Sequence, residues 1–499
     1  MGATLQGTKT YFQTHPLAGA AKPPVVLGKT GFSVSPVGFG GYRVYDTNSD
    51  HTAALKLAIE SGCNLIDTST NYTNGASEKA IGKVLAQLFA EKKITREQVV
   101  VVTKIGYVQG ENMEHVQARL AQRQPFSEMV EVHEDCWHCI SPDFLKDQIT
   151  RSLKRLGLDQ IDVLLLHNPE YFLKKNPDHS EYYRRIQQAF EYLETEVAAG
   201  RIQYYGISSN TFVEPKDHPH YTSFETTLTK AEELTHDNHY AVIQFPMNLY
   251  EPGAVLEENN SGQCVVEMAR EENIGTLVNR PLNAFFGKQM IRLADFPSHH
   301  GMDTVGLLKN AFTAAMELEA RYPGKAVLPA QNIAWGHIIK ENISKLSDLD
   351  NWKQVLAHQI RPTLAQAYEK LAPHAEMKDW TEKYVRVAEV LFLAFTAFLE
   401  SQAAMRSQQT KADLDQVVPA LKTSPTLTQK AVRIYRSIPG IHCVLVGMRQ
   451  VAYVKNILDL QPALDPQDAL DALGAVQARN EGSDAALDES HVSEGETEH

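Results

Sequence analysis

Eight short apolar runs, rich in strand-forming residues and separated by stretches with helical punctuation, constrain the fold of this chain most strongly. Strands that are buried on both faces and alternate with helices indicate a parallel sheet. Eight repeats of this unit predict an α/β protein with a closed (β/α)8 TIM barrel. The expected strands lie at residues 34–41, 64–69, 99–106, 161–168, 202–210, 240–245, 274–282 and 441–448.

The segments between these runs carry signals for helix starts and stops. Ser141, followed by a proline, predicts a helix start, and Gly157 predicts its end. Ser49 or Asp50 is expected to cap another helix, which Gly62 ends. Helices at these positions are what the alternating pattern of a barrel requires.

Two unusual spacings and the two termini complete the predicted organisation. Residues 107–140 are too many for a simple loop, and the stretch before the last strand is far too long for one helix. Two short extended pieces around the turn in "VVLGKTGFSVS" predict an N-terminal β-hairpin that covers the barrel bottom. We therefore expect an N-terminal extension (1–24), a barrel (25–282 and 437–460), a helical insertion (283–436) and an acidic, disordered tail (461–499).

Composition narrows the class of protein. The net charge is −13, and the segment Glu481 to His499 alone holds seven acidic residues with no Lys or Arg, which argues against binding to nucleic acid. Five cysteines suggest reduced thiols rather than a disulfide framework. The apolar run from Val390 to Leu399 is too short to span a bilayer, and no secretory signal is evident. These features predict a cytoplasmic protein that binds neither nucleic acid nor membrane.

Polar residues end three consecutive expected strands. Asp67 ends the second and is followed by Tyr72 in the loop, Lys104 ends the third, and His167 ends the fourth. The carboxyl ends of barrel strands form the rim where active sites of such barrels lie. Each of these residues taken alone has an ordinary structural explanation, such as a helix cap or a solvated strand end. Their arrangement on adjacent strands predicts one site.

The residue types indicate proton transfer. A tyrosine has a reference pKa of about 10, and a neighbouring ammonium group stabilises its anionic form. A carboxylate would keep the lysine charged and in place, and an imidazole would orient a substrate oxygen. A site with these residue types protonates a carbonyl oxygen, or deprotonates an alcohol, while a hydride is transferred to or from the carbon.

These residues and their flanking sequences resemble the aldo-keto reductase family. The resemblance rests on "LGKTGFSVSPVGFG", "NLIDTSTNYTNGASEKAIGKVL", "VVTKIG", "LLLHNPE", "YYGISSN" and "VIQFPMN", and it resumes at residues 437–460. It implies a barrel that binds NAD or NADP, with Tyr72 as general acid/base assisted by Asp67, Lys104 and His167. It also implies a small-molecule carbonyl or alcohol substrate, such as an aldehyde, a ketone or a sugar.

The resemblance further implies cofactor-binding positions on the remaining strands. Ser208, with Ser209 or Asn210, and Gln244 would hold the nicotinamide carboxamide. Tyr42 and Arg43 lie where family members contact cofactor and substrate, and Gly447 and Arg449 would contact the cofactor phosphates.

The chain departs from the family pattern at two places. Asn279 stands where many relatives carry an aromatic ring that stacks on the nicotinamide, so Arg280 or a ring of the insertion is expected to take its place. Residues 451–453 contain no basic side chain for the 2′-phosphate of NADP. The choice between NAD and NADP therefore stays open, with Arg449 as the single candidate for phosphate recognition.

The stretch "VHEDCWHCI" contains Cys136 and Cys139 at a spacing that suits zinc or redox chemistry, with His133 and His138 nearby. No second cysteine pair accompanies them, so no metal is expected, and the stretch is assigned to the substrate mouth.

Three functions compete. The first is an NAD(P)-dependent oxidoreductase, the second a cofactor-binding regulatory or scaffold barrel, and the third a lyase or isomerase that uses Lys104 as a Schiff base. The tyrosine and aspartate beside the lysine favour the first. The insertion is expected to cap the site, with Phe285 or Phe286 near the nicotinamide, or else to pack on the outer wall or mediate oligomer formation.

Overall fold

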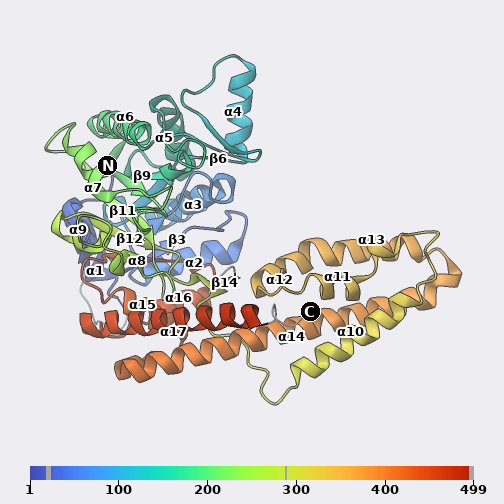
Figure 1. Cartoon of the computed structure of the whole chain (residues 1–499). Helices are drawn as coiled ribbons and strands as arrows, with labels where there is room; N and C mark the ends of the chain where they lie inside the picture. Colours follow the sequence, from blue (N-terminus) through green and yellow to red (C-terminus); the bar gives the residue numbers. More distant parts are fainter. Residues whose placement is uncertain (18–23, 287–288, 494–499) are drawn as a thin grey trace. The chain divides into compact units, whose positions relative to one another are not determined.

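The structure is a computed structural model that describes residues 1–17, 24–286 and 289–493. The chain forms two compact units. The first, here called the barrel unit, comprises Met1–Ala284 and Val417–His499, and the second, here called the helical unit, comprises Phe285–Gln416 (Figure 1).

Eight parallel strands close into a barrel in the barrel unit. Going round the barrel from β3, each strand pairs with the next in chain order, and β15 closes the ring against β3. The prediction of a (β/α)8 barrel is therefore confirmed. The strands are β3 (Val37–Gly40), β4 (Leu65–Asp67), β5 (Val100–Ile105), β9 (Ile161–His167), β10 (Ile202–Ser208), β11 (Tyr240–Pro246), β12 (Gly275–Asn279) and β15 (Cys443–Val446).

Helices follow the strands and cover the barrel. They are α2 (Ser49–Glu60), α3 (Ala76–Ala90), α5 (Pro142–Leu156), α6 (His179–Ala198), α7 (Phe224–Glu232), α8 (Gly253–Leu256), α9 (Val265–Glu271), α15 (Leu427–Tyr435) and α16 (Val451–Leu458). The predicted limits of α5 are confirmed, with Ser141 as N-cap and Gly157 in the left-handed conformation at its end. The cap of α2 is Asn48, because its side chain accepts hydrogen bonds from the N–H groups of Asp50 and His51.

The N-terminal segment covers one end of the barrel. It contains α1 (Leu5–Thr14) and the predicted hairpin, β1 (Val25–Val26) and β2 (Ser33–Val34), whose strands pair antiparallel. Leu27, Phe32 and Val34 are buried in one cluster with residues that begin the barrel strands, including Leu65 and Val100. The hairpin therefore closes the end of the barrel opposite the rim at which the strands finish.

The long segment after β5 forms a small subdomain of its own. It contains β6 (Tyr107–Val108), α4 (Glu111–Ala121), β7 (Val130–His133) and β8 (Cys136–His138), and its strands form a sheet in the order β6-β8-β7. The sequence predicted that this segment is unusually long and that its Cys136–Cys139 stretch helps to form the substrate mouth, but it did not predict the sheet.

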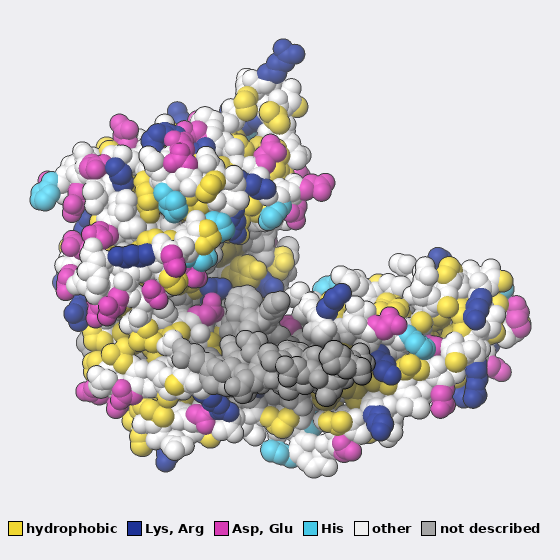
Figure 2. All heavy atoms as spheres, viewed as in Figure 1, with side chains coloured by type: hydrophobic (Ala, Val, Ile, Leu, Met, Phe, Trp, Pro, Cys, Tyr) yellow, Lys and Arg dark blue, Asp and Glu magenta, His cyan; other side chains and the backbone are white. Residues whose placement is uncertain are grey.

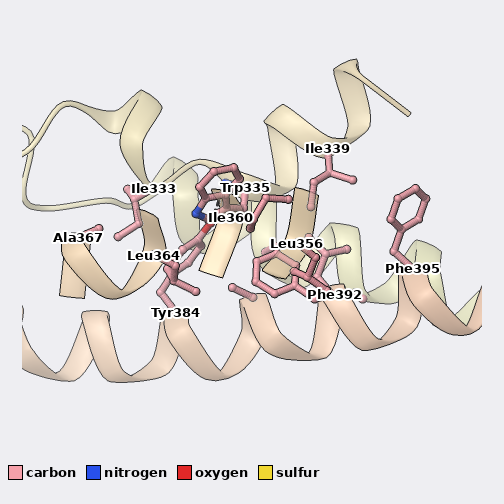
Figure 3. Packing of buried hydrophobic residues seen from close by; sticks show 14 of the residues in the cluster. Ile333, Trp335, Ile339, Leu356, Ile360, Leu364, Ala367, Tyr384, Phe392 and Phe395 are labelled. Carbon is pink, nitrogen blue, oxygen red and sulfur yellow. Dashed lines mark hydrogen bonds between the residues drawn. The ribbon is translucent and has the colours of Figure 1, made fainter. Parts of the chain in front are cut away.

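The helical unit has its own hydrophobic core. Its elements are α10 (Thr304–Ala320), α11 (Trp335–Glu341), α12 (Leu349–Val355), α13 (Arg361–Leu371) and α14 (Lys378–Val417), preceded by a hairpin of β13 (Asn283–Phe286) and β14 (Gln289–Arg292). In Figure 3 the side chains of Tyr384 and Phe392 extend from α14 toward those of Trp335, Ile360 and Leu364. The side chains of Phe285 and Phe286 lie outside the described residues.

One helix of the helical unit, within Ala375–Val417, is long and apolar enough to cross a membrane by length and composition. A core helix passes the same test, and one third of its most apolar window is buried. Leu391, Phe392, Phe395 and Leu399 of this helix belong to the core cluster. Their packing supports the reading of the run 390–399 as part of a folded helical core.

Two segment boundaries differ from expectation. Residues 417–436 belong to the barrel unit rather than the insertion, because α15 is the helix that precedes the last barrel strand. The tail expected to be disordered from residue 461 forms α17 (Pro466–Ser493), whose beginning contributes the buried residues Ala469, Ala472, Leu473 and Val476. Alanines and a leucine at helical spacing supplied enough apolar surface for docking. Residues 494–499 lie outside the described residues.

Truncations of α17 test this boundary. Ending the chain after Asn480 should leave the melting temperature unchanged, whereas ending it after Asp465 should lower it by several degrees. Because Leu473 is fully buried, Leu473→Ala alone should cost about 2–5 kcal/mol. Thermal unfolding followed by circular dichroism measures all three variants, and an equal loss in both truncations would contradict the assigned boundary.

Candidate active site

A buried ion pair lies at the rim of the barrel. The Lys104 Nζ donates to both carboxylate oxygens of Asp67, at 2.6 and 2.7 Å, and to the carbonyl oxygen of Thr68 at 2.8 Å. Lys104 is fully buried and Asp67 is 3 % exposed. The strands β4 and β5 pair in parallel next to each other, so their ends bring the two side chains together.

Burial acts on the pKa of each partner in opposite directions. Loss of solvent raises the pKa of Asp67 and lowers the pKa of Lys104, because burial disfavours both charged forms. Each charge opposes the shift of its partner, and three short hydrogen bonds hold the ammonium group. The geometry therefore favours a charged pair that is fixed in place.

Tyr72 lies beside this ion pair. The Lys104 ammonium is 4.8 Å from the centroid of the Tyr72 ring. Burial and the negative charge of Asp67 raise the pKa of Tyr72 well above its usual value, so the phenol is neutral. In this state Tyr72 is a proton donor.

The backbone directly after Tyr72 is strained. Thr73 and Asn74 have φ values of 49° and 55°, and Gly75 follows at 82°. A β-branched residue in the left-handed region is an outlier, with a cost on the order of 1–3 kcal/mol. The Thr73 hydroxyl donates to the carbonyl oxygen of Val44 at 2.7 Å, which holds this turn against the loop after β3.

His167 completes the set of four. Its ring centroid is 5.9 Å from that of Tyr72, and its Nδ1 is 3.0 Å from the hydroxyl of Ser69. Burial and the Lys104 charge lower the pKa of His167 well below its usual value, so the imidazole is neutral. His138 supports it from the subdomain after β5, with its Nε2 2.8 Å from the His167 carbonyl oxygen. The sequence did not single out Ser69 for this contact.

Gln244 connects the ion pair to two other strands. Its Nε2 donates to Asp67 Oδ1 at 2.8 Å, and its Oε1 accepts from the Ser208 hydroxyl and from Asn279 Nδ2, both at 3.2 Å. Five of the predicted residues, Lys104, Asp67, Gln244, Ser208 and Asn279, therefore form one continuous hydrogen-bonded network across the ends of β4, β5, β10, β11 and β12. The resemblance assigned Gln244 and Ser208 to the cofactor but did not predict the link to Asp67.

Ser209 and Asn210 turn toward a different partner, Glu170. The Ser209 hydroxyl donates to Glu170 Oε2 at 3.0 Å, and the Asn210 N–H donates to Glu170 Oε1 at 2.9 Å. The Ser209 hydroxyl therefore does not join Ser208 at Gln244. Glu170 is 2 % exposed, and burial raises its pKa to about 7. Glu170 ends the sequence "HNPE", which follows the fourth strand. Its position three residues after His167 is the sequence signal that could have revealed it.

The remaining predicted residues lie around the same rim. The Tyr42 ring contacts Tyr72 edge-to-face at 5.3 Å, and the Arg43 guanidinium is 5.4 Å from the Tyr42 ring. Arg280 forms an ion pair with Glu251 at 3.2 Å. Gly447 and Arg449 follow β15. Burial, and to a smaller extent the charge of Arg449, lowers the pKa of His51 at the start of α2.

Several features of the rim fit the dinucleotide that the resemblance implies. Asn279 Oδ1 is buried and has no hydrogen-bond partner among the described residues, so a carboxamide NH₂ group would satisfy it. A side chain added at Gly447 would meet no described atom within 4 Å, which leaves room for a phosphate. Helix α16 begins shortly afterwards, at Val451, and has no side-chain hydrogen bond at its N-cap. A helix N-terminus favours the binding of anions.

Cys136 and Cys139 do not form a metal site within the described part of the chain, where no group of three or more metal-ligating side chains occurs. Cys139 is almost fully buried, and burial raises the pKa of its thiol to about 11. His138, which the sequence grouped with these cysteines, instead supports His167.

The pKa of Glu170 generates a testable pH dependence. A carboxyl group whose pKa is raised on folding binds more protons in the native state, so stability falls as pH rises from about 4.5 toward 7. Glu170→Gln does not titrate, and its single amide oxygen can still accept from the Asn210 N–H, while its NH₂ group can donate to the Ser209 hydroxyl. The unfolding free energy of the wild type, relative to this variant, should therefore decline across that window. Denaturant titrations at several pH values measure it, and parallel curves would refute the shifted pKa.

Comparison with known proteins places this chain in a family. The family model described as "Aldo/keto reductase family" matches residues 36–322. The NADH-specific methylglyoxal reductase of Escherichia coli is 30% identical over 151 residues, which cover 29% of this chain and 41% of that protein. The D-threo-aldose 1-dehydrogenase of a Pseudomonas species is 28% identical over 201 residues, 39% of this chain and 54% of that protein.

The chain spans about half the length, or less, of the first curated relatives that it matches. Among solved structures, a glycerol dehydrogenase from Gluconobacter oxydans aligns over 92% of this chain and 95% of its own, at 15% identity and a TM-score of 0.46. The family model itself covers more than half of the chain and includes Asp67, Tyr72, Lys104 and His167. The predicted resemblance is confirmed: the chain belongs to the aldo/keto reductase family.

Proposed function

We propose that this chain is an NAD(P)-dependent oxidoreductase that interconverts a small carbonyl compound and the corresponding alcohol. The observation that carries the proposal is the buried Asp67–Lys104 pair beside a neutral Tyr72 and a neutral His167. Bound nicotinamide supplies or accepts the hydride. The residues of this chain then have to transfer one proton and orient the substrate oxygen.

Tyr72 is the proposed general acid. Its raised pKa keeps the proton on the phenol until a carbonyl oxygen gains negative charge. The Lys104 ammonium, held by Asp67, then stabilises the phenolate that is left behind. In the direction of alcohol oxidation the same ammonium favours formation of the phenolate base.

His167 is the proposed orienting group. A neutral imidazole has one N–H donor and one acceptor nitrogen. Because Nδ1 lies 3.0 Å from the Ser69 hydroxyl, Nε2 is the nitrogen left to contact a substrate oxygen. This nitrogen would hold the carbonyl oxygen next to the Tyr72 phenol.

The network around Gln244 is the proposed seat of the nicotinamide carboxamide. Asn279 takes the place of the stacking ring of many relatives, and its free Oδ1 offers a hydrogen bond in place of ring contact. Gly447, Arg449 and the start of α16 would hold phosphate, with Tyr42 and Arg43 beside the substrate.

The substrate class is proposed to be an aldehyde, a ketone or a sugar. The Tyr107 ring lies 4.7 Å from His167 and 4.9 Å from Tyr171, and it forms an aromatic wall that suits a compact substrate. Relatives named for methylglyoxal, D-threo-aldose and L-galactose agree with this class. A cytosolic location also belongs to the proposal. For the helical unit two alternatives are proposed: it caps the site, or else it packs on the outer wall or mediates oligomer formation. Steady-state assays with a panel of carbonyl and sugar substrates, with both cofactors in both redox states, test the class.

The alternative is a barrel that binds cofactor and serves mainly as a regulatory subunit. One relative, from Schizosaccharomyces pombe, bears the name of a potassium channel β-subunit. Tight cofactor binding with no turnover across the panel would favour this alternative and overturn the enzymatic proposal.

Substitution of Tyr72 separates proton transfer from cofactor binding. Tyr72→Phe should lower kcat by about 10²–10⁴-fold, because the phenol is the proposed proton donor. The Kd for NADP or NAD, measured by quenching of protein fluorescence, should stay nearly unchanged.

Exposed Tyr368 of α13 offers a matched control, since Tyr368→Phe removes a hydroxyl from a position that belongs to neither the strand-end rim nor the cofactor site. That variant should keep both kcat and Kd. Near-normal turnover in Tyr72→Phe would show that another group carries the proton.

A further inference from the structure

A basic cavity lies on the outer wall of the barrel unit, apart from the strand-end rim. It has a volume of about 790 Å³ and is lined by α3, α4, α5 and the loop that follows α4. The three helices carry their labels in Figure 1. Its cationic side chains outnumber its three acidic ones by two to one, and they are Lys79, Arg119, Lys146, Arg151, Lys154 and Arg155.

This charge balance is unusual for a chain of net charge −13. On the face of the molecule in Figure 2, acidic and basic side chains are intermixed. In the cavity the acidic side chains are already engaged. Asp147 accepts from His115 and Arg151, Asp143 accepts from Ser127 and Ser141, and Glu111 lies 3.5 Å from Lys79.

Two lysines of α5 remain unneutralised. Among the described residues, no carboxylate pairs with the ammonium group of Lys146 or Lys154. Both are exposed, and they lie eight residues apart on one face of α5, about 12 Å along the helix axis. An occupant that neutralises both must therefore be extended and carry more than one negative charge.

Arg119 provides a third cation from the opposite wall. Its guanidinium group is 4.2 Å from the centroid of the Phe126 ring, and its Nε donates to the carbonyl oxygen of Gln124 at 3.1 Å. These contacts fix the plane of the guanidinium while its terminal NH₂ groups keep donors for a phosphate. The cavity thus presents a fixed arginine together with two exposed lysines.

We propose that this cavity binds a small molecule that carries a chain of two or more phosphates. The ligand class follows from the separation of Lys146, Lys154 and Arg119. Cations this far apart can each contact a different phosphate of a chain, whereas a single small anion cannot contact all of them. The subdomain after β5 supplies one wall of the cavity through α4, and its ends place Tyr107 and His138 against His167. The proposed ligand therefore binds to the segment that flanks the strand-end site.

Isothermal titration calorimetry of the full chain tests the proposal. The probes are inorganic tripolyphosphate and, in a separate arm, ADP, each titrated into the wild type and into Arg449→Glu, a variant in which the proposed phosphate subsite after β15 carries a repulsive charge. At least one probe should bind, and the affinity should fall with added salt. If tripolyphosphate binds as tightly as ADP the site recognises phosphates alone, and tighter binding of ADP indicates a nucleotide.

The decisive variant is the double charge reversal Lys146→Glu/Lys154→Glu. It should lower the affinity by about tenfold or more, because both attractive charges become repulsive. The control Lys92→Glu/Lys216→Glu makes the same change in net charge at two exposed positions of the barrel unit that do not line the cavity, and it should leave the affinity unchanged.

Hydrogen exchange locates the bound probe. Protection should appear in residues 111–128 and 142–155. Absence of binding by either probe, equal losses in both double variants, or protection confined to residues 443–451 would overturn the proposal.

Discussion

The ion pair between Asp67 and Lys104 is the interaction on which the rim depends. A charge removed from water is costly unless a partner and hydrogen bonds replace the solvent, and here all three ammonium hydrogens have acceptors. Loss of one member of such a buried pair typically costs about 3–5 kcal/mol, because the other charge is left uncompensated. Lys104, which lies beside Tyr72, therefore also contributes to the stability of the barrel unit.

Two buried carboxyl groups at this rim differ because their surroundings differ. Asp67 contacts an ammonium group directly, which favours its ionised form. Ser209 and the backbone of Asn210, which are uncharged donors, hydrogen-bond to Glu170, and burial outweighs these contacts and the charge of Lys174 in setting its pKa. Gln244 links Asp67 to Ser208 on β10 and to Asn279 on β12, so the proposed nicotinamide site and the proposed proton-transfer site share one set of hydrogen bonds.

The barrel and its four central residues were accessible from the sequence because both follow local rules. Strands buried on both faces read as apolar runs, and strand ends must meet at one rim, so Asp67, Lys104 and His167 had to converge. The link from Gln244 to Asp67 depends on pairing across the barrel between residues 177 positions apart, which no local pattern encodes. Helix α17 was missed for another reason: its few docking residues, such as Leu473, are diluted among acidic ones.

The left-handed turn at Thr73 and Asn74 has a consequence for how this chain tolerates change. Glycine adopts such angles without steric penalty, so replacement of Thr73 would relieve strain in the folded state. It would also remove the hydroxyl that ties the turn to Val44 and thereby holds the residue beside it, Tyr72. Selection for heat resistance and selection for turnover would thus pull position 73 in opposite directions, and a library screened only for survival at high temperature should drift away from threonine there.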